Sequence, residues 1–155
     1  MGVEIERKFL LKNDGWRSQV VDSVRISQGY LTQNSGINSV RVRLSGDDAN
    51  INIKSRELAI RRQEYEYAIP ADDARRMLDS LCVGVVEKTR HHVKHAGTVW
   101  EVDEFAGENQ GLLVAEIELE SEDAHFDRPD WLGEEVSHDA RYYNVNLINH
   151  PYSAW

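Results

Sequence analysis

The feature that most constrains this chain is a period-two alternation of charged and apolar residues in its extended segments. In residues 1–10 the apolar side chains alternate with three charged ones, Glu4, Glu6 and Lys8. Successive side chains of a strand point to opposite faces, so these three share one face. Like charges at neighbouring sheet positions destabilise a sheet unless something compensates them. A solvated sheet face is the simpler interpretation of this strand alone, and a divalent cation held by the carboxylates is the alternative.

The same pattern recurs along the chain, which decides between these interpretations. Seven of the eight predicted strands carry charge on one face, in the sets Glu4/Glu6/Lys8, Arg41/Arg43, Lys54, Glu64/Glu66, Lys88/Arg90, Glu101/Asp103 and Glu116/Glu118/Glu120. Together these sets hold nine carboxylates and six bases, and most sets have one sign within a strand. A merely solvated sheet gives no reason for such segregation of sign.

The pattern predicts a single, mainly β domain of the α+β class over residues 1–155. The predicted strands are residues 1–10, 24–32, 39–44, 50–54, 61–69, 85–94, 99–105 and 112–121. A helix is predicted over residues 71–81, with shorter helices near 16–21 and 141–148 packing on the sheet.

Two geometries accept one charged face on so many strands. In an open sheet the charges face water and the apolar set packs on helices. In a closed barrel the charges point into the lumen, and the apolar set faces outward beneath the helices. Eight strands make a barrel just wide enough for packed side chains or one small ligand. Because isolated buried charges cost several kcal/mol each, such a lumen must hold water, cations and an anion.

Composition excludes several classes of function. The formal net charge is −9, which argues against general nucleic-acid binding, and no apolar run is long enough to cross a membrane. Charges begin at Glu4, unlike a signal peptide, and the single Cys82 cannot form an internal disulfide. We therefore expect a cytoplasmic protein, and the sequence leaves its oligomeric state open.

The charged residues point to phosphate and metal chemistry. Arginine offers a planar fork of donors to phosphate oxygens and lysine a mobile point charge, so bases from several strands suit a chain of phosphoryl groups. Divalent cations on the carboxylates would bridge to the phosphate oxygens and lower the pKa of a bound water. Neither a Gly-rich phosphate loop nor a zinc motif is present, and His91, His92 and His95 are interpreted as surface or strand-end residues.

The residues that carry this chemistry resemble those of the CYTH, or triphosphate tunnel metalloenzyme, family. The resemblance begins with the E-x-E-x-K signature in Glu4-Ile5-Glu6-Arg7-Lys8 and covers nearly the whole chain. It continues through Ser39-Val40-Arg41-Val42-Arg43, Ile53-Lys54-Ser55, Arg62-Gln63-Glu64-Tyr65-Glu66, Val86-Glu87-Lys88-Thr89-Arg90, Trp100-Glu101-Val102-Asp103, Ala115-Glu116-Ile117-Glu118 and the segment 134–144. One departure is His91, where short bacterial members often have tyrosine.

The resemblance implies an eight-stranded antiparallel tunnel that binds triphosphate compounds with Mg²⁺ or Mn²⁺. It implies metal ligation by Glu4, Glu6, Glu116 and Glu118, with Asp103 nearby. It implies phosphate binding by Lys8, Arg41, Arg43, Lys54, Lys88 and Arg90, with Glu64 and Glu66 orienting those bases or water. Among these, Glu4, Glu6, Lys8, Lys88 and Glu116 are the predicted catalytic residues.

The leading hypothesis is a metal-dependent hydrolase of inorganic triphosphate, in which a metal-activated water attacks a terminal phosphorus. The resemblance is greatest to the small bacterial inorganic triphosphatases of the family. One alternative is an adenylate cyclase of the same family, which makes cyclic AMP and pyrophosphate from ATP. The other is a module that binds polyphosphate or a nucleotide without turnover, although binding alone would not need both acidic strands.

Overall fold

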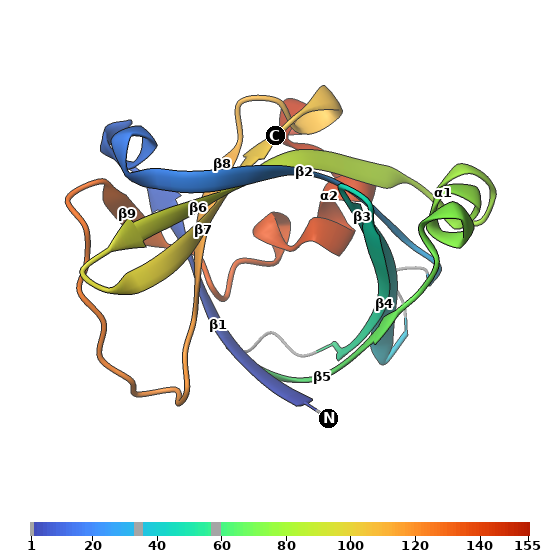
Figure 1. Ribbon diagram of the computed structural model, residues 1–155, viewed down its shortest axis with the longest axis horizontal. Helices are drawn as coiled ribbons and strands as arrows, with labels where there is room; N and C mark the ends of the chain where they lie inside the picture. The colour runs from blue at the N-terminus through green and yellow to red at the C-terminus, as the bar shows by residue number, and fades with distance from the viewer. Residues whose placement is uncertain (1, 33–35, 57–59) are drawn as a thin grey trace.

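The strands of the protein close into a ring in the computed structural model, which describes residues 2–32, 36–56 and 60–155 (Figure 1). They are β1 (Gly2–Leu11), β2 (Val20–Tyr30), β3 (Asn38–Ser45), β4 (Asp48–Ser55), β5 (Arg61–Ala68), β6 (Val85–His95), β7 (Thr98–Phe105), β8 (Leu113–Glu118) and β9 (Leu132–Glu135). Their order is β5-β4-β3-β2-β6-β7-β8-β1-β9, with a further β5–β1 pairing, and the neighbours are antiparallel. Eight strands therefore form the predicted closed barrel, and β9 is an additional strand beside β1.

Strand β1 closes the ring because it pairs along both of its edges. Gly2–Ile5 pair with β5, Glu6–Phe9 pair with β8, and the end of β1 pairs with β9. On the edge of β1 that pairs with β5 and β9, residues just after β9 bond the part of β1 that lies between these two strands. Lys8 N donates to Ser137 Oγ at 3.0 Å, and Val136 N donates to Lys8 O at 2.8 Å. Both backbone groups of Lys8 are therefore bonded, which fixes the position of that residue in the barrel wall.

Helix α1 (Ala71–Ser80) packs outside the barrel and confirms the predicted helix. Asp72 and Asp73 in its first turn favour the helix N-terminus, and Ala74 is buried against Val42 and Ala49. Near the start of the chain the predicted helix is a single 3-10 turn, η1 (Gly15–Gln19), and β2 begins at Val20 rather than at residue 24.

The end of the chain contains more than the predicted helices. The four-residue strand β9 was missed, because it is too short to show an alternation in the sequence. It is followed by η3 (Ala140–Tyr142), α2 (Asn144–Asn149) and η4 (Tyr152–Ala154), and a further short turn, η2 (Gly107–Asn109), follows β7. Among the described residues, no helix combines the length and the apolar character that crossing a bilayer requires.

Two apolar clusters cover the barrel wall on its outer side. One contains Phe9, Trp16, Trp100 and Trp131, which come from β1, η1, β7 and the segment before β9. The other contains Ala74 of α1. Irregular segments therefore share with helices the task of covering the outward face.

A third apolar cluster lies inside one end of the barrel. Val86, Phe105 and Val114 follow the same strand phase as the charged residues, but they pack against Leu147 of α2. In Figure 1 the helical segment before the C-terminal turn, which includes α2, lies partly within the outline of the ring. We call residues 136–148 the C-terminal plug, because they fill this end of the lumen and confine the charged side chains to the remainder.

Candidate active site

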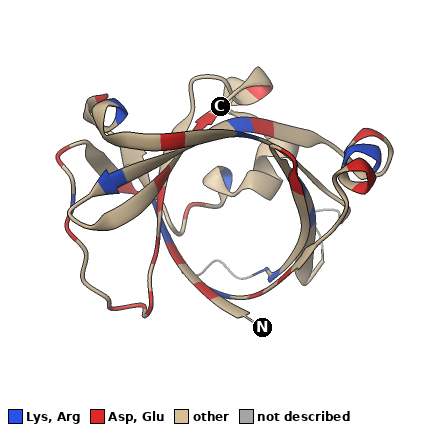
Figure 2. Cartoon of the chain, in the orientation of Figure 1, with Lys and Arg blue, Asp and Glu red and all other residues tan. Residues whose placement is uncertain are grey.

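The lumen contains a cavity of about 280 Å³ whose described wall is mostly charged. It is lined by seven acids and seven bases, together with Tyr30, Ser39, Asn52, Tyr143, Asn144 and Val145. The acids are Glu4, Glu6, Glu64, Glu66, Glu101, Glu116 and Glu118, and the bases are Lys8, Arg41, Arg43, Lys54, Arg62, Lys88 and Arg90. Figure 2 shows acidic and basic positions on strands all around the ring. The closed geometry therefore applies, and charged residues from separate strands face one space.

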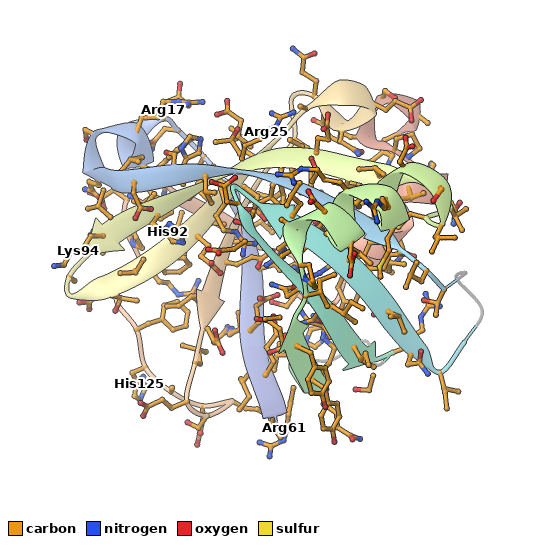
Figure 3. All side chains as sticks on the ribbon, turned by 45° about the vertical axis from the view of Figure 1, so that its right-hand side comes forward. Arg17, Arg25, Arg61, His92, Lys94 and His125 are labelled. Atoms are coloured by element: carbon orange, nitrogen blue, oxygen red, sulfur yellow. The ribbon has the colours of Figure 1, made fainter. Side chains whose placement is uncertain are left out.

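Not all the charge lies in this space. Figure 3 labels Arg25, Lys94 and His125 at the outside of the molecule, and the side chains of Arg25 and Glu87 form an exposed ion pair at 3.3 Å. Glu120, which shares its phase with Glu116 and Glu118, follows the end of β8 and does not line the cavity. His91, which interrupts the family pattern, bonds Ser23 Oγ at 2.7 Å and Glu104 Oε1 at 3.1 Å, away from the cavity.

Strand register places acids beside bases in the cavity wall. Glu4 lies opposite Arg62, Lys54 opposite Glu64, and Lys8 opposite Glu116. The Lys8 ammonium donates to Glu116 Oε1 at 2.8 Å and to Glu6 Oε1 at 3.1 Å. The Lys54 ammonium lies 2.7 Å from Glu4 Oε2 but outside hydrogen-bond geometry, so no described residue donates a hydrogen bond to this buried oxygen.

The carboxylates of β1 and β8 crowd one another. Burial and the charges of Glu116 and Glu4 together raise the pKa of Glu6 to about 7, although Lys8 lowers it. Glu116 is also buried, but Lys8 and Arg90 hold the pKa of its carboxyl well below the usual range. Below about pH 7 one proton therefore resides on Glu6, while Glu116 stays ionised. A divalent cation would replace this proton and relieve the repulsion.

Asp103 does not face the cavity. It is fully buried, its two oxygens accept hydrogen bonds from Arg90 Nε and Nη2 at 2.8 and 2.9 Å, and Lys88 Nζ donates to Oδ2 at 2.6 Å. Burial alone would raise the pKa of Asp103, but the charges of Arg90 and Lys88 outweigh burial and lower it to about 2. This carboxylate holds two bases in place, which leaves its oxygens occupied.

The bases of β3 have a different environment from the other bases. Among the described residues, no carboxylate lies within ion-pair distance of Arg41 or Arg43, and Arg41 Nε is buried without a hydrogen-bond acceptor. Burial and the neighbouring charges of Arg41 and Arg90 lower the pKa of Arg43 to about 10. These two side chains form the part of the cavity where an anion is most favoured.

Strand order places this anion-favouring part across the lumen from the crowded carboxylates, since β3 lies opposite β8 in the ring.

The sequence model of the CYTH domain matches residues 2–152. The chain belongs to the CYTH domain family.

Similar proteins agree with this assignment. An inorganic triphosphatase of Acetivibrio thermocellus is 46% identical over 153 residues, covering 98% of this chain and 97% of that protein. An inorganic triphosphatase of Nitrosomonas europaea is 39% identical over 149 residues, covering 93% and 95%. A crystal structure of an inorganic triphosphatase superposes with a TM-score of 0.68 at 37% identity, covering 96% of this chain and 95% of that one. The CYTH tunnel fold is thus shared along nearly the full length.

The sequence located most of this CYTH cavity but not all of it. Every predicted site residue except Asp103 lines the cavity. Arg62 was not among the predicted residues, although it is in phase with Glu64 and Glu66 on β5. Gln28, Tyr143 and Asn144 were also missed, because neutral side chains add nothing to a charge pattern and the last two come from the C-terminal plug.

Proposed function

We propose that this CYTH protein is a divalent-metal-dependent hydrolase of inorganic triphosphate, with residues 1–155 acting as one domain. The single observation that carries the proposal is the division of the cavity into crowded carboxylates on β1 and β8 and carboxylate-free arginines on β3. The relatives named inorganic triphosphatase support the reaction assigned to this cavity.

The balance of charge supports a requirement for metal. With seven acids and seven bases, the described part of the cavity wall has no excess positive charge to offset a triphosphate polyanion. Carboxylate oxygens are the ligands that Mg²⁺ and Mn²⁺ prefer. Glu4, Glu6, Glu116 and Glu118 would hold such a cation, and the crowding that raises the pKa of Glu6 fits a cation-binding role. When bound, the ion supplies charge neutralisation to the phosphates and acidifies a water molecule.

The described residues contain no cluster of three His, Cys, Asp or Glu side chains already arranged for a metal. Lys8 lies between Glu6 and Glu116 instead, bonded to both. We propose that Lys8 turns from these carboxylates to the phosphate when metal and substrate enter together. Asp103 remains a predicted metal ligand, but its contacts with Lys88 and Arg90 favour an orienting role.

The remaining bases would bind and orient the phosphate chain. Arg41 and Arg43 would take phosphate oxygens directly, because none of the carboxylates that the structure describes competes for them. Lys88 is fully buried, and burial lowers its pKa to about 7 against the opposing charge of Asp103. An amine with such a pKa can hold or release a proton near neutral pH, which suits charge stabilisation on a leaving phosphate. Glu64 and Glu66 both accept from Asn52 Nδ2 at 3.0 Å and would order water or bases at the β5 side.

The cavity wall favours inorganic triphosphate over a nucleotide. Among its described lining residues, aromatic or aliphatic side chains come only from Tyr30, Tyr143 and Val145. Nucleobase sites in proteins are largely apolar, so this wall offers little to adenine. Adenylate cyclase activity is therefore the second outcome to be tested. The single cysteine favours a reducing, cytoplasmic setting, which we propose for this protein.

The proposal is tested by offering tripolyphosphate, ATP and thiamine triphosphate to the purified protein with Mg²⁺ or Mn²⁺. Release of phosphate and pyrophosphate from tripolyphosphate is the expected result, lost on addition of EDTA. Cyclic AMP with pyrophosphate from ATP would replace this assignment by a cyclase, and no product from any substrate would favour a binding module.

Two glutamine variants give a matched comparison. Glu6→Gln removes a carboxylate that would bind the cation and should lower kcat for tripolyphosphate at least ~100-fold. Glu120→Gln makes the same substitution just beyond the end of β8, outside the cavity, and should keep kcat within about twofold. Equal rates for both variants would contradict metal binding at Glu6.

A further inference from the structure

Gln28 of β2 is a fully buried polar side chain that the proposed reaction does not use. Its Oε1 accepts hydrogen bonds from Arg43 Nε at 3.2 Å and from Arg43 Nη2 at 3.1 Å. Its Nε2 donates to Asn144 Oδ1 at 2.8 Å. Every polar atom of this amide therefore has a partner, and both partners line the cavity.

Asn144 extends the chain of contacts to a second base. Its Oδ1 also accepts from Lys88 Nζ at 2.9 Å, so one amide oxygen receives donors from β2 and β6. Asn144 is the first residue of α2, in the C-terminal plug, and β2 and β6 are neighbouring strands. The plug thus reaches the cavity through a side chain that contacts both Gln28 and Lys88.

Arg43, Gln28, Asn144 and Lys88 form a chain of hydrogen bonds, which we call the relay. Its two central residues, Gln28 and Asn144, are uncharged. Other bases of the cavity form ion pairs with carboxylates: Lys8 with Glu116, Lys54 with Glu4, Arg62 with Glu6, and Arg90 with Asp103. Lys88 also pairs with Asp103, so Arg43 is the base of this relay that no described carboxylate neutralises. A carboxylate at position 28 would orient Arg43 equally well but would cancel its charge. An amide orients the guanidinium and leaves the full positive charge for a ligand.

We propose that Gln28 and Asn144 are positioning residues that hold Arg43 and Lys88 toward the phosphate chain without neutralising Arg43. The inference rests on the proposed triphosphate function. It adds a reason for the chemical identity of two neutral residues and links the C-terminal plug to substrate affinity.

Gln28→Glu is the decisive variant, because glutamate has nearly the same shape and keeps an acceptor for Arg43. Glutamate loses the donor to Asn144 Oδ1, but the ion pair with Arg43 should offset this loss, so the thermal midpoint of the ligand-free protein should change little. It should raise KM for tripolyphosphate with Mg²⁺ about tenfold and lower kcat less than threefold, because the new charge opposes the polyanion. Gln110→Glu, which adds the same charge at an exposed position outside the cavity, should keep both constants.

A merely structural role for Gln28 predicts another pattern. Gln28→Glu would then lower the thermal midpoint and leave KM unchanged, and that result would overturn the proposal. Gln28→Leu and Asn144→Ala complete a cycle. Each should weaken tripolyphosphate binding, and the double variant should lose less affinity than the sum of the single losses. Strictly additive losses would show that the two amides act separately and would also overturn the proposal.

A measurement of binding distinguishes failure of the triphosphatase proposal from failure of the proposal for Gln28 and Asn144. The stabilisation of each variant by tripolyphosphate and Mg²⁺ is measured by thermal unfolding, whether or not phosphate is released. A wild-type protein that is stabilised but does not release phosphate would refute the triphosphatase and still test the relay. A wild-type protein that tripolyphosphate does not stabilise would refute both.

Discussion

At the scale of single residues, the cavity shows how burial and neighbouring charge assign different roles to the same side chain. Glu6 and Glu116 lie near one another and both contact Lys8, yet the pKa of Glu6 is raised while that of Glu116 is lowered. Asp103 and Glu101 both contact Arg90, but only Glu101 lines the cavity. In this barrel a carboxylate can line the cavity, hold a neighbouring base in place, or do both.

Glu6→Gln should stabilise the metal-free protein at alkaline pH. The folded pKa of Glu6, about 7, lies above its ordinary value of 4.5, so its contribution to stability is full below pH 4.5 and is lost as pH rises through 7. Glutamine stays neutral at all pH values. We expect a gain on the order of 2 kcal/mol at pH 8 and little gain at pH 4.5, from denaturant unfolding in EDTA.

Glu120→Gln is the control for this effect, because its side chain is exposed and outside the cavity. Its unfolding free energy should match the wild type at both pH values. A Glu6→Gln gain that does not depend on pH would contradict the raised pKa.

Asp103→Asn should destabilise the protein strongly. The substitution leaves Lys88 and Arg90 buried beside a neutral amide, and breaking a buried ion pair by removing one partner costs about 3–5 kcal/mol. Denaturant unfolding in EDTA measures the loss, with exposed Asp123→Asn as the control. A loss below about 1 kcal/mol would indicate that water or another carboxylate replaces Asp103.

At the scale of elements, β1 and the C-terminal plug organise the barrel from opposite ends of the chain. β1 pairs with three strands, and Ser137 and Val136 bond the backbone of Lys8. The plug then places Leu147 among Val86 and Phe105 inside the lumen. The apolar packing of α2 therefore sets the position of Asn144 at the cavity.

Leu147→Ala should lower both stability and substrate affinity. Leu147 is 1% exposed, and truncating a buried leucine costs about 2–5 kcal/mol. If the plug positions Asn144, KM for tripolyphosphate should rise at temperatures where the variant is still folded. Val99→Ala, at an exposed position of β7, is the control for both measurements. An unchanged KM would separate the plug from the site.

At the scale of the whole molecule, the proposed function requires an acidic protein to bind a polyanion in a cavity whose described wall is balanced in charge. The chain carries a formal net charge of −9, while the described cavity wall has seven acids and seven bases. Long-range attraction of the ligand by the protein is therefore not available, and salt screens the distant charges over about 8 Å. Affinity must come from the local arginines and from cations that enter with the substrate.

Tripolyphosphate and Mg²⁺ should each need the other for tight binding. Either one alone should raise the thermal midpoint slightly, and both together should raise it by more than the sum, because each compensates the charge of the other. Thermal unfolding over a grid of the two concentrations measures this coupling. Equal protection by tripolyphosphate with and without Mg²⁺ would contradict a metal requirement for substrate binding.

The sequence predicted the parts of this structure in which charged and apolar residues alternate along a strand. The alternation in Glu4, Glu6 and Lys8 recurs as one charged face on seven strands and located most of the cavity wall. The alternation alone allowed an open sheet as well as a barrel, and the resemblance to the CYTH family predicted the closed form. β9 was not predicted because four residues carry no periodic signal. Gln28 and Asn144 were not predicted because their importance arises from contacts between β2, β6 and α2, which no local pattern contains.

The C-terminal plug also limits how a substrate can pass through the barrel. With apolar side chains filling one end of the lumen, a long phosphate polymer cannot thread from one side to the other. We expect reactants to enter and leave by the same mouth, so that a terminal unit is removed in preference to an internal one. A reaction product that leaves the cavity slowly would then block entry of the next substrate molecule.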